Sequence, residues 1–302
     1  MSSVPRSAEP SAAHGRHRSP ASVAGAARVA ASVAFVLLAV TGCMPDGSGR
    51  PDVGAAPGHP GVVPTGVVVD YQLGGGYDPA GGVGGVVRDA SDSPADDLWS
   101  ACYVNGFQTQ PGEADLWLDD HADLVLREDD GTPVTDPAWP DEMLLDLSTA
   151  EKRAGIVEVL GPVLRSCAAA GFDAVELDNL DSWTRSDGRL TEDDAVDLAA
   201  RYVVVAHEAG LAVGQKNAAE LGARGRDEAH FDFAVAEECQ RWDECARYTD
   251  VYGPAVLDIE YADDLGADWG QVCADPQVPP STILRDRDLT VPGDPAYVFD
   301  RC

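Results

Sequence analysis

The chain has 302 residues, of which 44% are hydrophobic, and it carries 52 acidic against 21 basic side chains, a formal net charge of −31. The hydrophobic content is enough for one core. A field of this sign repels nucleic acid and anionic lipid headgroups, so neither is expected as a partner. Most of the charge is interpreted as a solvated acidic coat, which favours a neutral or cationic ligand.

The N-terminal residues have the pattern of an export signal. Several arginines precede an apolar run over residues 29–40, which is short for a transmembrane helix of about 20 apolar residues. The sequence Val-Thr-Gly-Cys at 40–43 is similar to a bacterial lipobox, in which the cysteine is lipidated and becomes the new N-terminus. Residues 1–42 are therefore expected to be a signal peptide, and the protein an extracellular lipoprotein held on the cell membrane by Cys43. An ordinary secretory signal or an uncleaved anchor is the alternative.

Residues 43–64 are rich in Gly, Pro, Ala and Asp and have no apolar periodicity. This composition predicts a flexible tether between the lipid and the folded part of the chain. Residues 65–302 then form one domain, because an α/β barrel usually takes about 250 residues. No internal repeat is visible, and a monomer is expected.

Seven cysteines are present, and with Cys43 assigned to the lipid an even number remains for disulfides in an oxidising compartment. The sequence predicts pairing of neighbours, Cys102–Cys167, Cys239–Cys245 and Cys273–Cys302, although other pairings are possible. A zinc site is the competing interpretation. It is disfavoured because no two cysteines have the short spacing of zinc ligands and no histidine lies nearby.

Short apolar, β-branched runs alternate with helical patterns after the tether, which indicates parallel strands joined by crossover helices. Strands are predicted at residues 67–69, 83–87, 101–104, 143–147, 174–177, 211–213, 233–236, 256–259 and 282–284. The first run is expected to be an additional N-terminal strand, and the other eight to close a (β/α)8 TIM barrel. An open doubly wound sheet is the alternative, but no Gly-rich dinucleotide loop follows an early strand.

Two helices are clear in the sequence. One covers residues 150–170 and stops at Gly171, and the other covers residues 191–209 with Thr191 as its N-cap.

Residues just past the C-terminal ends of the strands form the active face of a parallel barrel. Polar residues occupy nearly all of these positions: Arg88-Asp89, Asn105, Asp146, Asp178-Asn179, Lys216-Asn217, Glu237-Glu238, Glu260-Tyr261 and Arg285-Asp286. The strand period of two puts Glu176 and Asp178 inside the barrel, with Asp178 nearer the mouth, and it puts Glu237 at the mouth as well. Glycoside hydrolysis commonly uses two such facing carboxyl groups. Ion pairing with Lys216 or Arg285 is the structural alternative.

Several motifs follow one another in the order of a known family: Tyr71–Leu73, Cys102–Asn105, Gly171–Asp181, Gly214–Asn217, Phe231–Cys239 with Asp243–Cys245, and Ile259–Tyr261. From about Val67 to Cys302 the chain resembles the endo-α-1,4-polygalactosaminidases, glycoside hydrolase family 114. The resemblance implies a TIM barrel that hydrolyses α-1,4-linked galactosamine polymers with an aspartate and a glutamate. The matching positions are Asp178 and Glu237. Leu177 and Ala236 stand where the family often has Pro and Asn.

The predicted function is that of an endo-acting glycoside hydrolase that cleaves α-1,4-galactosaminidic bonds in a partly deacetylated galactosamine polysaccharide. Asp178 is expected to be the base or nucleophile and Glu237 the general acid, without a metal or cofactor. Candidate substrate-binding residues are Asp89, Asn105, Glu176, Asn179, Asp181, Lys216, Asn217, Glu238, Glu260 and Tyr261. Trp183 is a candidate for stacking on a sugar ring, with a buried loop anchor as the alternative.

Two other functions are consistent with parts of the sequence. A non-catalytic carbohydrate-binding surface lipoprotein would use the same barrel mouth, and Ala236 beside the candidate acid motivates this alternative. A metal-dependent hydrolase would use the many aspartates, but few histidines lie near strand ends.

Overall fold

The computed structural model describes residues 63–302. The predicted signal peptide, the lipidation site Cys43 and all but the last two residues of the predicted tether lie outside this range. Within residues 63–302, none of the helices is both long enough and apolar enough to span a bilayer.

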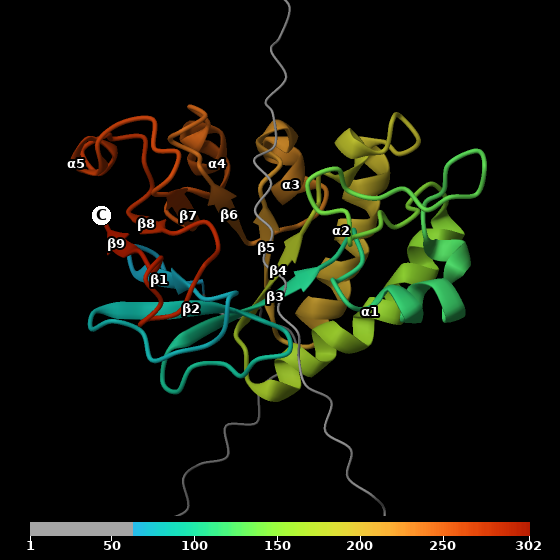
Figure 1. Cartoon of the computed structure of the whole chain (residues 1–302), viewed down its shortest axis with the longest axis horizontal. Coiled ribbons are helices and arrows are strands. Elements are labelled where there is room, and N and C mark those ends of the chain that lie inside the picture. Colours follow the sequence, from blue (N-terminus) through green and yellow to red (C-terminus); the bar gives the residue numbers. More distant parts are fainter. Residues whose placement is uncertain (1–62) are drawn as a thin grey trace, which may run out of the picture. The chain divides into compact units, whose positions relative to one another are not determined.

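Nine strands form one sheet and follow one another in chain order (Figure 1). The first eight are parallel, each hydrogen-bonded to the next, and the ninth runs antiparallel to the eighth. They are β1 (Val68–Tyr71), β2 (Val83–Asp89), β3 (Trp99–Asn105), β4 (Ala174–Asp178), β5 (Ala212–Lys216), β6 (Phe233–Glu237), β7 (Val256–Tyr261), β8 (Ser281–Arg285) and β9 (Phe299–Arg301).

A side chain closes the barrel between β8 and β1, since the described strands show no backbone ladder there. The guanidinium of Arg285 in β8 donates to Asp70 Oδ1 in β1 at 3.1 Å and to the carbonyl oxygen of Tyr71. Arg285 and Asp70 are fully buried, so each charge depends on the other for compensation. The result is a nearly closed α/β barrel, and the predicted fold class is confirmed.

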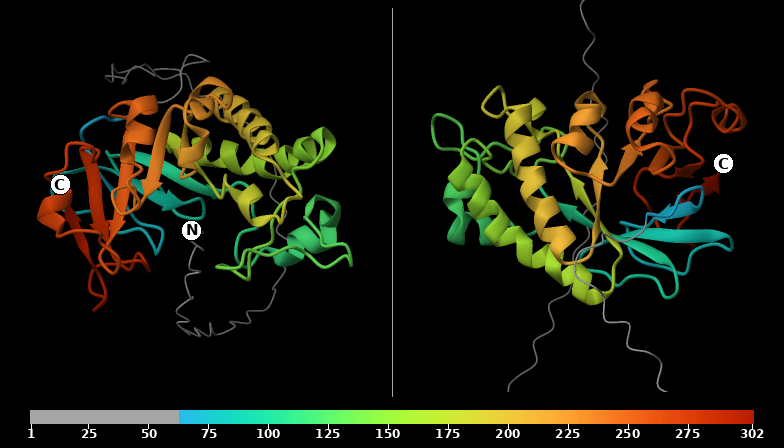
Figure 2. Two further views of the ribbon diagram at one scale, coloured as in Figure 1. Left: turned by 90° about the horizontal axis from the view of Figure 1, so that it is seen from above. Right: turned by 180° about the vertical axis from the view of Figure 1, so that it is seen from behind.

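Helices follow only some of the strands. They are α1 (Ala150–Ala170), α2 (Glu192–Glu208), α3 (Ala223–Asp227), α4 (Cys245–Tyr252) and α5 (Trp269–Val272). In Figures 1 and 2, α1 and α2 lie side by side on the outside of the sheet; α1 packs against β3 and β4, and α2 against β5. Loops without a helix join β1 to β2 and β2 to β3, so that this part of the barrel has no helical cover.

The two helices predicted from the sequence are confirmed. In α2 the Thr191 side chain accepts a hydrogen bond from the Asp194 backbone N–H, and the Asp194 carboxylate accepts one from the Thr191 N–H, which is a capping box. Helix α1 begins after Thr149 as its N-cap and ends at Gly171, whose φ of 99° is accessible to glycine at little cost.

The alternation along each strand produces two cores. Inward-facing residues such as Val69, Val87, Leu257 and Ile283 fill the barrel, while outward-facing residues pack against the helices. Phe233 fills the interior so closely that a Cβ on Gly214 would lie 2.6 Å from its ring. Only glycine fits at that position of β5.

The strand assignment differs from the sequence prediction at two places. The first predicted run is not an addition to the barrel, because β1 is one of its eight parallel strands. Residues 143–147 form no strand of the sheet and make only isolated antiparallel bridges to Gln108, Val125 and Thr135, within a long excursion between β3 and α1. An apolar run predicts that a segment is buried but does not specify which segment it packs against. For this reason residues 143–147 were predicted as a barrel strand in place of β1. The extra strand is β9, at the C-terminal end of the described chain.

The three predicted disulfides, Cys102–Cys167, Cys239–Cys245 and Cys273–Cys302, are confirmed. They tie β3 to α1, the start of the loop after β6 to the start of α4, and the segment after α5 to the final residue.

Candidate active site

A lysine stands at the centre of a group of carboxylates inside the barrel. The Nζ atom of Lys216, at the end of β5, lies 3.1 Å from Glu237 Oε2 and 3.4 Å from both Asp178 Oδ1 and Glu176 Oε1. Lys216 is 3% exposed and Glu176 is fully buried, whereas Asp178 and Glu237 reach the surface of the cavity described below. Strand parity therefore places these side chains inside the barrel, as the sequence predicts.

The charges of this group shift one another's pKa values. Burial acts to lower the pKa of Lys216, but the carboxylates of Asp178 and Glu237 outweigh it and hold that pKa well above its usual range. Burial acts to raise the pKa of Glu237, but Lys216 and the hydrogen bonds from Tyr261 and Asn217 lower it overall. For Glu176 burial wins, and it raises the pKa to about 7 despite Lys216. At neutral pH the lysine is charged and Glu237 is an anion.

Tyrosines that the sequence analysis did not assign to the site orient the acids. Tyr103 Oη donates to Asp178 Oδ2 at 2.6 Å, and Tyr71 Oη donates to Glu176 Oε1 at 2.6 Å. Burial raises the pKa of both phenols well above the usual value, so they remain protonated donors. Strand register could have predicted the place of Tyr103 in the site. Tyr103 in β3 is paired directly with Glu176 in β4, so the two side chains face the same side of the sheet.

Glu237 is held by two residues that the sequence predicted for the site. Asn217 Nδ2 donates to Glu237 Oε2 at 3.0 Å, and the Glu237 backbone N–H donates back to Asn217 Oδ1 at 2.8 Å. Tyr261 Oη donates to Glu237 Oε1 at 2.5 Å. With Lys216 also in contact, the orientation of this carboxylate is set before any ligand arrives.

The backbone turns in the same unusual way directly after three neighbouring strands. Asn179 after β4, Asn217 after β5 and Glu238 after β6 have φ values of 61°, 47° and 58°. Left-handed conformations cost free energy for residues other than glycine and are common at functional sites. The turns direct the chain away from the barrel at the positions that carry Asp178 and Glu237.

A cavity of about 640 Å³ opens above these groups. Its floor includes Tyr103, Asp178, Asn217, Glu237 and Tyr261. The excursion between β3 and α1 supplies one set of lining residues, Gln110, Pro111, Asp136, Ala138, Trp139 and Glu142, and the loops after β1 and β8 supply Leu73, Gly74, Arg287, Asp288 and Leu289. This volume is within the range of small-ligand sites, about 300–1,000 Å³.

Hydrogen bonds connect the β3–α1 excursion to the floor. Asn105 Nδ2 donates to Glu142 Oε2 at 2.9 Å, and Asn179 Nδ2 donates to Asn105 Oδ1 at 2.9 Å. Arg185 forms ion pairs with Asp136 at 2.7 Å and with Asp181 at 2.9 Å. Asp136, Glu142 and Arg185 were not predicted from the sequence, because they lie far from any strand end of the barrel.

The structure brings most predicted site residues to the cavity but not all of them. Those that line it are Asp89, Asp178, Asn179, Asp181, Asn217, Glu237 and Tyr261. Glu176, Lys216 and Asn105 lie behind this surface and contact the lining residues. Glu238 forms an ion pair with Arg287 at 2.8 Å and does not line the cavity. Trp183 is partly buried against the core beneath the helices, which fits a loop anchor.

Glu260 lies on the other side of the barrel wall. Leu257, Ile259 and Tyr261 face the interior, so the alternate residues Asp258 and Glu260 face outward. Glu260 is fully buried, and its Oε1 accepts a hydrogen bond from the Gln240 backbone N–H at 2.7 Å. Burial raises the pKa of Glu260 to about 7 and that of Asp258 well above its usual range.

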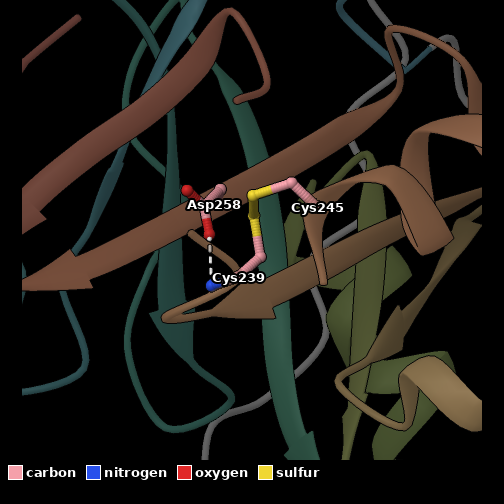
Figure 3. Close-up of side chains that lie close together, drawn as sticks. All are labelled: Cys239, Cys245 and Asp258. Carbon is pink, nitrogen blue, oxygen red and sulfur yellow. Dashed lines mark hydrogen bonds between the residues drawn. A yellow bond between two sulfur atoms is a disulfide. The ribbon is translucent and has the colours of Figure 1, made fainter. Parts of the chain in front are cut away.

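Asp258 lies beside the disulfide Cys239–Cys245 (Figure 3). Its Oδ1 accepts a hydrogen bond from the Cys239 backbone N–H at 3.3 Å. Within residues 63–302, Cys239, Cys245 and Asp258 form the one group of three potential metal-binding side chains that lie close enough together to hold one ion. Because the two sulfur atoms are bonded to each other, neither is a free thiolate ligand. The disulfide instead holds the loop that follows Glu237.

The two departures from the family pattern point away from the cavity. Leu177 and Ala236 are fully buried in the core that packs between the strands and the helices. Ala236 therefore does not remove a hydrogen bond from the cavity face of Glu237, whose amide partner comes from Asn217.

Two carboxylates at the ends of neighbouring parts of one barrel mouth, on β4 and β6, are the kind of arrangement that glycoside hydrolysis commonly uses. The family model of glycoside-hydrolase family GH114 matches residues 53–302. The chain belongs to this family and is a glycoside hydrolase.

Solved structures with the same fold include Ega3 from Aspergillus fumigatus in complex with galactosamine, with a TM-score of 0.63 at 20% identity, covering 80% of this chain and 97% of that one. The glycoside hydrolase domain of PelA from Pseudomonas aeruginosa has a TM-score of 0.54 at 16% identity and covers 76% of this chain and 97% of that domain. No curated protein matches the chain.

Proposed function

We propose that this glycoside hydrolase is an endo-acting enzyme that cleaves α-1,4-galactosaminidic bonds in a partly deacetylated galactosamine polysaccharide. Asp178 and Glu237 are the proposed catalytic pair. The observation that carries the proposal is their geometry: both carboxylates lie on the floor of one cavity, and each contacts the same ammonium group of Lys216.

The chemistry follows from the two carboxylates. Asp178 attacks the anomeric carbon as the bond from that carbon to the bridging oxygen breaks, and the protonated form of Glu237 donates its proton to the leaving oxygen. Because the pKa of Glu237 is lowered, only a minor fraction of the free enzyme carries this proton at neutral pH, and we expect the rate to rise as the pH falls from neutral. Glu237 then removes a proton from water, which attacks the same carbon and releases Asp178. Lys216 and Tyr103 stabilise the negative charge that Asp178 needs for the first step.

The spacing of the pair favours retention of configuration. Because Asp178 Oδ1 and Glu237 Oε2 both contact Lys216 Nζ, at 3.4 and 3.1 Å, these two oxygen atoms are at most about 6.5 Å apart, which only reaches the lower limit of the inverting range. Retaining glycosidases have carboxyl groups about 5–5.5 Å apart, whereas inverting enzymes need about 6.5–9.5 Å to admit a water. We expect products released with the anomeric configuration of the substrate, which proton NMR of the first products would detect. Initial products of the opposite configuration would contradict this.

The substrate class rests on family membership and on charge. The Ega3 structure, which shares the fold, contains galactosamine. The cavity surface of this chain carries Asp89, Asp136, Glu142, Asp181 and Asp288 besides the catalytic pair, against Arg185 and Arg287. An acidic cavity favours a sugar polymer with free ammonium groups over a fully acetylated or anionic one.

The test is to incubate the purified protein with α-1,4-galactosamine polymers of graded acetylation and to follow chain shortening by mass spectrometry. We expect short oligomers from the partly deacetylated polymer and none from the Asp178→Asn variant. Binding of oligomers by the wild-type protein without any turnover would support a carbohydrate-binding protein instead. Cleavage of a different glycan, again lost in Asp178→Asn, would support the proposed catalytic residues but contradict the proposed substrate.

We also propose that the protein is exported and anchored to the membrane by a lipid on Cys43, with residues 1–42 removed and residues 43–64 as the tether. Three disulfides within the described residues suit an oxidising compartment outside the cytoplasm. In a bacterial host, the wild-type protein should sediment with membranes and incorporate labelled fatty acid, whereas Cys43→Ser should do neither. Equal membrane association of both proteins would contradict the anchor.

A further inference from the structure

Trp139 is an unusually exposed tryptophan in the lining of the catalytic cavity. Its side chain is 64% exposed, although the residue belongs to the same cavity surface as Asp178 and Glu237. Among residues 63–302, no aromatic ring or cation stacks on its indole, whereas Trp99 packs against Phe233. One apolar face of about the size of a sugar ring is thus open at the mouth of a glycosidase site.

The turn that carries Trp139 is internally fixed. Asp136 Oδ1 accepts hydrogen bonds from the Ala138 N–H at 2.7 Å and from the Trp139 N–H at 3.3 Å. The Asp136 N–H donates to the Glu142 carbonyl oxygen at 3.0 Å, and the Glu142 N–H donates to the Trp139 carbonyl oxygen at 2.9 Å. Residues 136–142, called the tryptophan turn below, therefore form a closed loop with Trp139 at its tip.

Both ends of the tryptophan turn are tied to the residues beside the catalytic pair. At one end, the second carboxylate oxygen of Asp136 accepts from Gln108 Nε2 at 2.9 Å and pairs with Arg185 at 2.7 Å. At the other end, Glu142 accepts from Asn105, which in turn accepts from Asn179, the neighbour of Asp178. An exposed tryptophan at an unconstrained loop tip would need no such support. The bonds hold the indole at one position relative to Asp178.

We propose that the tryptophan turn is a sugar-binding subsite in which Trp139 stacks on a ring of the bound polysaccharide, away from the bond that is cleaved. A pyranose of the galacto configuration has one face of C–H groups, which suits the flat indole, while its hydroxyl and amino groups lie at the ring edge. Glu142 offers a carboxylate on the same cavity surface and makes no ion pair within the described residues, so it suits an ammonium or hydroxyl group at that edge. This proposal rests on the proposed function. It adds that Trp139 makes the enzyme prefer polysaccharide chains long enough to reach the tryptophan turn.

The chain offers a matched control in Trp242. Its side chain is similarly exposed, at 56%, but it does not line the cavity, and the Arg241 guanidinium lies 4.8 Å from its ring. Trp139→Ala and Trp242→Ala thus remove similarly exposed indoles, one inside and one outside the proposed subsite. Circular dichroism spectra of both variants, compared with that of the wild type, check that they fold.

The first measurement is steady-state cleavage of the galactosamine polymer and of a series of its oligomers. We expect Trp139→Ala to raise KM for the polymer about tenfold and to change kcat much less. The rise in KM should be smaller for oligomers that are too short to reach the tryptophan turn. Trp139→Phe should recover part of the loss, and Trp242→Ala should behave as the wild type. Equal kinetics of Trp139→Ala and Trp242→Ala on the polymer would overturn the subsite and leave the proposed function intact.

A second measurement separates the subsite from the reaction. Calorimetric binding of galactosamine oligomers to Asp178→Asn protein should weaken about tenfold when Trp139→Ala is added and stay unchanged when Trp242→Ala is added. If the wild-type protein binds these oligomers but never cleaves them, this comparison still decides the subsite while the proposed function fails. If Asp178→Asn binds none of them, the subsite for this polymer is refuted whatever the enzyme cleaves.

Discussion

Two groups of carboxylates lie on opposite sides of the same barrel wall, and they differ in their contact with a cation. The inner group, Glu176, Asp178 and Glu237, surrounds the ammonium of Lys216. The outer pair, Asp258 and Glu260, lies beneath the loop closed by Cys239–Cys245. Within residues 63–302 neither acid forms an ion pair, and their contacts are hydrogen-bond donors such as Thr282 Oγ1, 3.0 Å from Asp258.

The difference shows what a single cation does to buried acids. Without a cation in direct contact, burial raises the pKa of Glu260 to about 7, although the charge of Arg241 acts to lower it, and burial raises the pKa of Asp258 well above its usual range. These acids are therefore largely protonated at mildly acidic pH. With Lys216 and two hydrogen-bond donors in contact, the pKa of Glu237 is lowered although burial acts to raise it. The inner acids suit charge-dependent chemistry, and the outer acids fix a loop.

The largest expected effect distinguishes the two groups by activity. Asp178→Asn or Glu237→Gln removes a carboxylate that acts on the scissile bond, and we expect kcat to fall about a thousandfold or more. Glu260→Gln keeps the shape and the acceptor for the Gln240 N–H and should leave kcat within about twofold. Initial rates on the polymer decide the matter, and a comparable loss in Glu260→Gln would abolish the distinction between the groups.

Removal of the cation should make the inner group resemble the outer one. Lys216→Met leaves three facing carboxylates without a counter-charge, and breaking a buried pair in this way costs about 3–5 kcal/mol of unfolding free energy at pH 7. Burial raises the pKa of Glu176 to about 7 even with Lys216 acting to lower it, and the variant loses that opposing charge. The stability of the variant should therefore rise as the pH falls towards 5. Urea denaturation at both pH values measures this.

The matched control for that variant is Lys216→Met with Glu176→Gln, which removes one negative charge together with the positive one. It should recover part of the lost stability at pH 7. Equal stability of Lys216→Met and the wild type at pH 7 would mean that the lysine does not stabilise the group.

A smaller effect concerns the outer pair. The pKa of Glu260 is about 7 in the folded protein against an ordinary 4.5, so the folded state binds the proton more tightly and stability falls as the pH rises between these values. Glu260→Gln removes this loss. We expect the variant to be more stable than the wild type by about 1–3 kcal/mol at pH 8, with the gap closing below about pH 4.5. Thermal unfolding across this range tests it; a gap independent of pH would contradict it.

The smallest effect assigns roles within the inner group. Tyr261→Phe removes a hydrogen bond to the Glu237 carboxylate and so raises the pKa of Glu237. If Glu237 is the general acid, the basic limb of the kcat/KM profile moves to higher pH. Movement of the acidic limb instead would make Glu237 the group that acts as an anion and exchange the roles of the pair.

Local patterns were enough to predict much of the fold. Both long helices begin and end as their caps indicate, and the strand period places Glu176, Asp178 and Glu237 inside the barrel. The same period explains why Glu260 is not at the cavity: β7 continues to Tyr261, so Glu260 is an outward residue within the strand and not a residue beyond its end.

Three of the cavity residues that the sequence analysis missed lie in the β3–α1 excursion. Asp136, Trp139 and Glu142 belong to a segment of turns and isolated bridges, without a period that would indicate which face it presents. Their place at the cavity depends on contacts with Gln108, Asn105 and Arg185, which are distant in sequence.

The sequence by itself determined the family, the alternation of strands with helices and the side of the strand on which each candidate acid lies, because all of these depend on short-range spacing or on recognisable motifs. Only the tertiary structure decided which apolar runs share the barrel, which cysteines are paired, how Arg285 closes the barrel and that one lysine meets three carboxylates. Those outcomes depend on distances between side chains of different strands, and the pKa values that follow depend on burial and charge at those distances.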